Sequence, residues 1–210
     1  MRLEIDDKGS MEQAAEALRG LPGAIDKIAQ KATRASMKGV KREATAKVAE
    51  RYTIQRGRIG TTMRVAYKGK TAEFSSRGRV NDLAYFKHTP RSVPKHRPPK
   101  GKYLFSQVVK GEGGTIAHAF LARMRSGHVG VFERTGKNAD SVPSYWRPTW
   151  GWGANKGKGV KEGIKKLSGP STPQMVGYPT IRDYLEEQMK RRFEEAMEAG
   201  TAEALGRFRT

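Results

Sequence analysis

The chain has 210 residues and a formal net charge of +20, because 41 Lys and Arg side chains stand against 21 Asp and Glu. It contains no cysteine, which excludes disulfide scaffolds, cysteine-ligated zinc sites and thiol nucleophiles. The N-terminus lacks the apolar stretch of a signal peptide, and no apolar run approaches the roughly 20 residues that cross a bilayer, so we expect no membrane partner.

The first elements predicted along the chain are helices within residues 10–50. A short helix is expected at about 10–19, and a longer one from about Pro22 to Glu50. Small or apolar residues repeat in the longer segment at spacings of three and four, which is typical of an amphipathic helix: Ile25, Ile28, Ala29, Ala32, Ser36, Val40, Ala44 and Val48. Because this stripe is thin and rich in alanine, we expect it to pack closely against a sheet or another subunit.

An antiparallel sheet of hairpins is predicted over residues 60–135. The three hairpins have their turns at Lys68-Gly69-Lys70, at residues 110–114 and at Ser126-Gly127-His128. Their strands are expected at 63–67 and 71–75, 103–109 and 115–120, and 120–125 and 129–134, with a further strand at 83–88.

Two segments do not fit regular structure. Residues 89–102 contain four prolines, and residues 138–163 are rich in glycine and carry three tryptophans. Long loops of this kind are usually functional. The predicted fold class is therefore α+β, with long N-terminal and C-terminal helices that flank the sheet and with long basic loops.

The last predicted element is a helix from about Thr180 to Arg207, which Gly200 is expected to kink or to end early. We therefore expect two parts in the chain. Residues 1–178 form an α+β domain made of the N-terminal helices, the sheet, and a loop with an extended connection at 138–178. Residues 179–210 form a separate C-terminal helix.

The positive charge is concentrated in the middle of the chain, where residues 51–180 hold 25 Lys and Arg against six Asp and Glu. Such clusters fit the phosphates of nucleic acid, and they equally fit an acidic protein. Both alternatives stay open for the candidate contact residues, which are Lys87, Arg91, Lys95, Arg97, Lys100, Lys102, Lys156, Lys158 and Lys161.

No group of residues in the sequence predicts catalysis. The four histidines lack metal-ligand spacing; His128 reads as a hairpin tip and His118 as a strand residue. Six scattered acids in residues 51–180 would not easily build a two-metal centre. We therefore expect no enzyme activity, no catalytic residue, no metal and no cofactor.

Candidate subunit-interface residues come from two segments. Trp146, Trp150 and Trp152 lie in the glycine-rich loop and are typical of interface anchors. Residues 169–173 predict a stiff, extended connection that serves either a neighbouring subunit or an internal corner. The candidates from this region are Gly169, Pro170, Pro173 and Met175.

Three blocks of sequence carry a family resemblance. Residues 119–134 read AFLARMRSGHVGVFER, residues 165–175 read KKLSGPSTPQM, and residues 46–54 read AKVAERYTI. They resemble the minor tail protein Z family, the tail completion proteins of long-tailed bacteriophages, over roughly residues 30–178. Residues 138–163 depart from the family pattern, which has an Arg-Leu-Pro-Ile-like segment there.

The resemblance implies a structural virion protein at the head-proximal neck of a phage tail, assembled in the host cytoplasm. Its partners would be further copies of itself in a ring, a hexamer or a trimer, together with the tail terminator, the tail tube and the head connector. Genomic double-stranded DNA in the channel is a further candidate. The alternative is a stand-alone basic nucleic-acid-binding protein.

Overall fold

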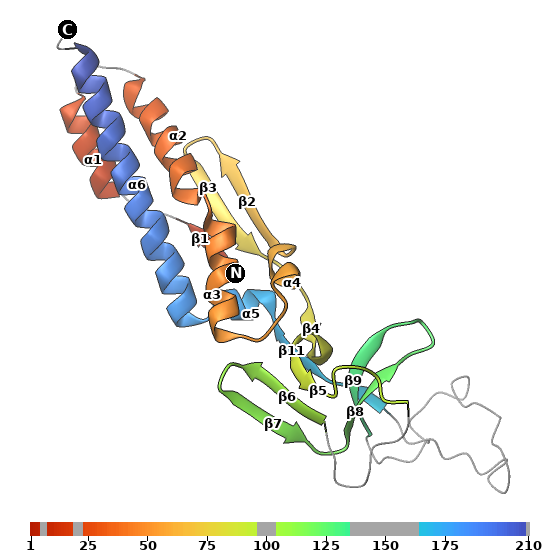
Figure 1. Cartoon of the computed structure of the whole chain (residues 1–210). Coiled ribbons are helices and arrows are strands. Elements are labelled where there is room, and N and C mark those ends of the chain that lie inside the picture. Colours follow the sequence, from red (N-terminus) through yellow and green to blue (C-terminus); the bar gives the residue numbers. More distant parts are fainter. Residues whose placement is uncertain (5–7, 19–22, 96–103, 135–163, 209–210) are drawn as a thin grey trace, which may run out of the picture. The chain divides into compact units, whose positions relative to one another are not determined.

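The computed structural model describes residues 1–4, 8–18, 23–95, 104–134 and 164–208 (Figure 1). The chain divides into two compact units, one made of residues 1–79 and 170–210 and the other of residues 80–169. This division differs from the predicted boundary at 178/179. The C-terminal helix belongs with the N-terminal helices, because its apolar side packs against them.

The first unit combines helices with a three-stranded antiparallel sheet of order β1-β3-β2. Its strands are β1 (Arg2–Glu4), β2 (Met63–Lys68) and β3 (Thr71–Ser76). Its helices are α1 (Lys8–Ala17), α2 (Ala24–Met37), α3 (Val40–Arg51), α4 (Arg56–Gly60), α5 (Thr172–Val176) and α6 (Pro179–Phe208). No helix in these described ranges is long and apolar enough to span a bilayer.

The core of the first unit lies where α2 packs along α6 on one side and against β3 on the other (Figure 1). Ala29 and Ala32 of α2 are buried against Phe193 and Met197 of α6, and α1 adds to the same cluster. The small alanine side chains let the two helices approach closely. The thin alanine stripe of the sequence is therefore the surface on which the C-terminal helix packs.

The prediction of a single helix over 22–50 is wrong, because the helix is interrupted at Lys38 and Gly39. Lys38 is extended, and Gly39 has a φ of 82°, in the left-handed region that favours glycine. The Gly39 carbonyl then accepts from the amides of Arg42 and Glu43 and begins α3. The apolar repeat continues through the break, so periodicity alone did not reveal it.

The expectation that Gly200 kinks or ends the last helix is also wrong, since α6 runs through it without interruption. A Cβ atom at residue 200 would lie 2.7 Å from Cγ2 of Ile28. Gly200 thus serves the close contact between α2 and α6 and not a break in the helix.

This contact gives a prediction that uses two glycines of one helix. Gly206→Ala meets nothing within 4 Å and should gain stability from the better helix propensity of alanine. Gly200→Ala must displace Ile28, so we expect it to be less stable than Gly206→Ala by about 1 kcal/mol. Urea unfolding followed by circular dichroism measures the difference; equal stability of the two variants would contradict the close contact.

The second unit consists of short strands and one turn of 3₁₀ helix at Leu83–Tyr85. Its strands are β4 (Val80–Asp82), β5 (Lys87–Thr89), β6 (Leu104–Val109), β7 (Glu112–Ile116), β8 (Ala119–Arg123), β9 (Val129–Arg134) and β10 (Ile164–Lys166). They form the antiparallel sheets β5-β6-β7 and β10-β9-β8. β4 pairs with β11 (Ser168–Ser171), and the division between the units falls within β11.

The α+β class is confirmed, while the single sheet over 60–135 is not. The described strands form four small sheets, and some of them recruit strands from outside that range. The second hairpin turns at Lys110-Gly111, so β7 begins before the predicted strand at 115. Only part of 83–88 is a strand, and His118 lies in the connection between β7 and β8 with a φ of 60°.

The stiff connection predicted over 169–173 is extended only as far as Ser171. Helix α5 then begins, because Ser171 and Gln174 form a capping box in which the Ser171 amide donates to Gln174 Oε1 at 2.8 Å. Pro173 fits this first turn, where its missing N–H leaves no bond unmade. The S-x-x-Q spacing of this capping box is present in the sequence. It begins a helix at a point where the prolines alone favour an extended chain.

Candidate interaction surfaces

The described members of the predicted basic contact set are exposed on the second unit. Lys87 lies on β5, and Arg91 and Lys95 follow it. The remaining six lie outside the described residues: Arg97, Lys100, Lys102, Lys156, Lys158 and Lys161. The prediction that this set contacts an acidic partner or DNA therefore stays a prediction.

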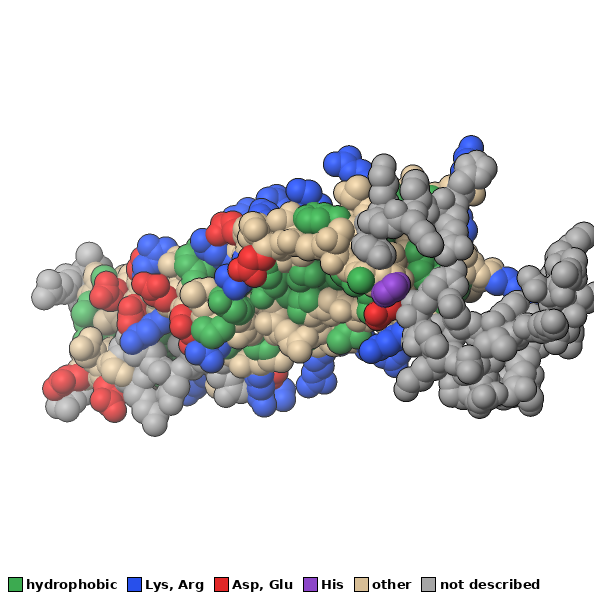
Figure 2. Space-filling view, turned by 90° about the horizontal axis from the view of Figure 1, so that it is seen from below, with side chains coloured by type: hydrophobic (Ala, Val, Ile, Leu, Met, Phe, Trp, Pro, Cys, Tyr) green, Lys and Arg blue, Asp and Glu red, His purple; other side chains and the backbone are tan. Residues whose placement is uncertain are grey.

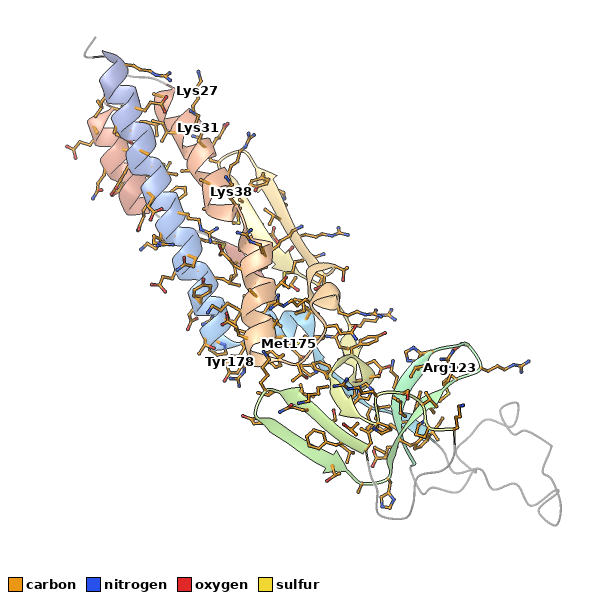
Figure 3. The ribbon with its side chains drawn as sticks, viewed as in Figure 1. Lys27, Lys31, Lys38, Arg123, Met175 and Tyr178 are labelled. Atoms are coloured by element: carbon orange, nitrogen blue, oxygen red, sulfur yellow. The ribbon has the colours of Figure 1, made fainter. Side chains whose placement is uncertain are left out.

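The predicted interface residues fall in different environments. Trp146, Trp150 and Trp152 lie outside the described residues. Gly169, Pro170 and Pro173 are half-buried, whereas Met175 is fully buried (Figure 3). Met175 is therefore a core side chain of the first unit, and its side chain offers no surface to a neighbour.

The one buried carboxylate of the described second unit is Asp82, with only 1% of its side chain exposed. Its Oδ2 lies 2.7 Å from Nε2 of His128 and 3.0 Å from Nζ of Lys166, and its Oδ1 accepts from the Ala84 amide at 3.1 Å. Three separate segments, β4, the tip of the β8–β9 hairpin and β10, thus meet at one carboxylate.

Burial raises the pKa of the Asp82 carboxyl and is the largest single influence on it. The Ala84 amide, Lys166 and His128 act in the opposite direction and together outweigh burial, so the pKa lies below its ordinary value. Asp82 is therefore ionised, and its oxygens already accept from three donors. This arrangement is typical of a residue that holds segments of the chain together. His128 is a hairpin tip as predicted, but its ring is held by this carboxylate.

No group of three His, Asp or Glu side chains in the described ranges could hold a metal ion. The other charged features of the described residues are two surfaces on the helices of the first unit.

A basic stripe runs along α2 on the first unit. It consists of four exposed side chains at spacings of four, three and four: Lys27, Lys31 and Arg34 of the helix and Lys38, its C-cap. Figure 3 labels the three lysines. At about 100° per residue, these positions share one side of the helix, and the buried side chains of α2 lie on the other. Within the described residues, no ion pair satisfies any of the four charges.

An acidic face lies on α6 and α1 of the same unit. Glu187, Glu194 and Glu198 share the outer side of α6, and Glu12 is exposed on α1. Glu194 and Glu198 also line a hollow of about 580 Å³ between these helices, together with Met197 and Leu205. Figure 2 shows acidic side chains close together over the helices of this unit.

Neither surface is visible in the net charge of whole segments. Residues 1–50 are nearly neutral in sum, with ten basic and eight acidic side chains. The available signal was the helical spacing of Lys27, Lys31, Arg34 and Lys38, which sorts the cations of α2 onto one side of the helix.

Comparison with known protein families, curated proteins and solved structures gives no match for this chain. The fold, the charged surfaces and the three sequence blocks are therefore the features that bear on function.

Proposed function

We propose that this is an assembly protein that acts by binding macromolecular partners and not by catalysis. Two features support this class. The described residues carry opposite charges on separate surfaces of one unit, and the tight polar cluster around Asp82 is already satisfied by its own chain. Surfaces of this kind give orientation and specificity to protein association.

Within that class, we propose a tail completion component of a long-tailed phage, located at the head-proximal neck of the tail. Copies form a ring, a hexamer or a trimer, around the DNA path and join the tail tube and tail terminator to the head connector. In this architecture, the long terminal helices flank the sheet region, and the basic loops at 89–102 and 138–163 reach DNA or an acidic neighbour.

The observation that carries this proposal concerns the two larger blocks that resemble the minor tail protein Z family. Residues 119–134 form the β8–β9 hairpin, and the second block begins in β10. β10 pairs with β9, with Lys165 opposite Glu133 and Lys166 opposite Phe132. Blocks separated by about 30 residues in the chain therefore form adjacent strands, as expected of one structural unit.

Deletion of the gene from its phage tests this function. We expect electron micrographs to show heads and tails that fail to join, or that join without infectivity, and a plasmid copy of the gene should restore infectious particles. Normal infectious particles from the deleted phage would contradict the proposal.

Sedimentation separates this function from the stand-alone nucleic-acid-binding alternative, which the basic stripe on α2 also favours. The tail proposal predicts self-association of the purified protein and weak binding of duplex DNA by the monomer. The alternative predicts a monomer that binds duplex DNA at submicromolar concentration, with an affinity that falls steeply as salt increases.

A further inference from the structure

We infer that copies of this chain associate head to tail, with the basic stripe on α2 of one copy docked on the acidic face of α6 and α1 of the next. This inference rests on the proposed ring and names the two surfaces that would build it. The basic stripe consists of Lys27, Lys31, Arg34 and Lys38, and the acidic face of Glu12, Glu187, Glu194 and Glu198.

The charges of both surfaces lack adequate partners within the described chain. No ion pair there involves the four cations of the basic stripe, nor Glu12, Glu187 or Glu198. The contact between Lys190 and Glu194 is 3.7 Å long, with both side chains largely exposed. By contrast, Lys70 at the nearby hairpin turn is paired with Asp26 at 2.6 Å. The stripe thus keeps its charge available for another molecule.

The two surfaces match in length. The basic stripe runs over twelve residues from Lys27 to Lys38, and the acids on α6 run over twelve residues from Glu187 to Glu198, so each has eleven residue steps between its ends. At 1.5 Å per residue, each is about 16 Å long. Helices of neighbouring copies can therefore lie side by side with charges of opposite sign along their whole contact. Lys190 and Arg191 interrupt the acidic face and restrict the register.

The directions in which the two surfaces face restrict the symmetry of the assembly. α2 and α6 pack against each other through their buried sides, with Ile28 against Gly200 and Ala32 in the same cluster as Phe193. The outer sides that carry the charges therefore face away from each other. A two-fold contact through either surface leaves the other one unpaired, whereas a head-to-tail contact pairs both surfaces of every copy and gives a ring when the rotation between copies closes.

The hollow beside the acidic face favours a protein side chain as its occupant. It is lined by Glu194 and Glu198 together with the apolar Met197 and Leu205, and Leu205 is 38% exposed. A lysine or arginine side chain has an apolar stem and a charged end, so it fits such a lining. Duplex DNA would contact only the basic stripe and would leave this acidic hollow empty.

Charge reversal tests the inference. The first variant combines Lys27→Glu with Lys31→Glu, and the second combines Glu194→Lys with Glu198→Lys. Each variant alone cancels the net charge of one surface and places two of its side chains against charges of the same sign, so we expect self-association to weaken at least tenfold in sedimentation equilibrium at low salt. An equimolar mixture should recover association, because every contact between the two variants again joins opposite charges.

A matched control reverses two cations on another surface of the same unit. Arg64→Glu with Lys68→Glu changes the net charge equally on the exposed side of β2, and self-association should remain as in the wild type. Circular dichroism of each variant verifies that the helices are formed.

Three outcomes would overturn the inference in distinguishable ways. Association of the two reversal variants at wild-type strength would place the contact elsewhere and leave the ring intact. Loss of duplex DNA binding by the α2 variant with unchanged self-association would assign the basic stripe to nucleic acid. A wild-type protein that stays monomeric at all concentrations would remove the proposed ring itself.

Discussion

Replacement of Arg192 by methionine is expected to lower the free energy of unfolding of the first unit by about 3 kcal/mol. The guanidinium of this α6 residue reaches across to the break between α2 and α3. It donates to the carbonyl of Ser36 at 3.3 Å, to the carbonyl of Lys38 and to the carboxylate of Glu43. Methionine retains most of the packing of the side chain but leaves these acceptors without their donor.

The cost should be large because the site is partly shielded from water. The side chains of Arg192 and Glu43 are only 18% and 27% exposed. The two carbonyls also terminate α2, where no amide of that helix follows to satisfy them. Arg192→Lys keeps the charge but cannot bond in several directions from one planar group, so it should recover only part of the loss.

Urea unfolding, followed by circular dichroism and by hydrogen exchange of the α3 amides, measures this effect. Arg191→Met is the matched control, since Arg191 is 60% exposed, its contact with Glu195 is 3.9 Å long, and its hydrogen bond to Gln188 at 2.8 Å is exposed to water. We expect the control to change stability by less than about 0.5 kcal/mol. Equal stability of the two variants would show that Arg192 does not hold the break between α2 and α3.

The helices of the first unit were largely predictable, because their buried side chains recur at helical spacing along the sequence. Ile28, Ala32 and their neighbours recur at helical spacing, and the buried side of α2 follows that repeat. The break at Gly39 was not predicted, because the apolar repeat passes through it. The role of Gly200 inside a continuous helix was also not predictable, because Ile28, which it contacts, is 172 residues away in the chain.

The strands were likewise predictable only where strands that are neighbours in the sequence pair with each other. Tight turns at Gly69 and Gly127 made two hairpins predictable from local sequence. The β6–β7 hairpin was less predictable, because the glycines within β7 disfavour a strand. The strand forms there because β7 pairs with β6. The addition of β10 to β9 depends on partners about 30 residues apart, and no local pattern predicts it.

The candidate surfaces were only partly predictable. The helical spacing of the α2 cations could have revealed the basic stripe, whereas the acidic face depends on α1 and α6 lying together. The polar cluster of the second unit had no signal in the sequence at all. Asp82, His128 and Lys166 come from three distant segments, and only the folded chain brings them within 3.0 Å.

Loss of the Asp82 charge is expected to destabilise the second unit by about 2 kcal/mol at neutral pH. Asp82→Asn keeps the shape of the side chain and an oxygen for the Ala84 amide, but it removes the charge that His128 and Lys166 meet. The effect is smaller than for a fully buried pair, because water reaches both partners, which are 37% and 46% exposed. Glu112→Gln is the control, since Glu112 is exposed on β7 and its loss changes the charge of the unit equally.

The pH dependence of this difference follows from the pKa of Asp82. The unfolded carboxyl titrates near 3.9, and the folded pKa lies lower. The ionised form is therefore favoured by folding, so its contribution is complete above about pH 5 and is lost as the pH falls through the folded pKa. Hydrogen exchange of the β8 and β9 amides in wild type and Asp82→Asn should show a gap at pH 7 that closes toward pH 3. A gap that widens over that range would mean that the carboxylate does not stabilise the three segments that meet at it.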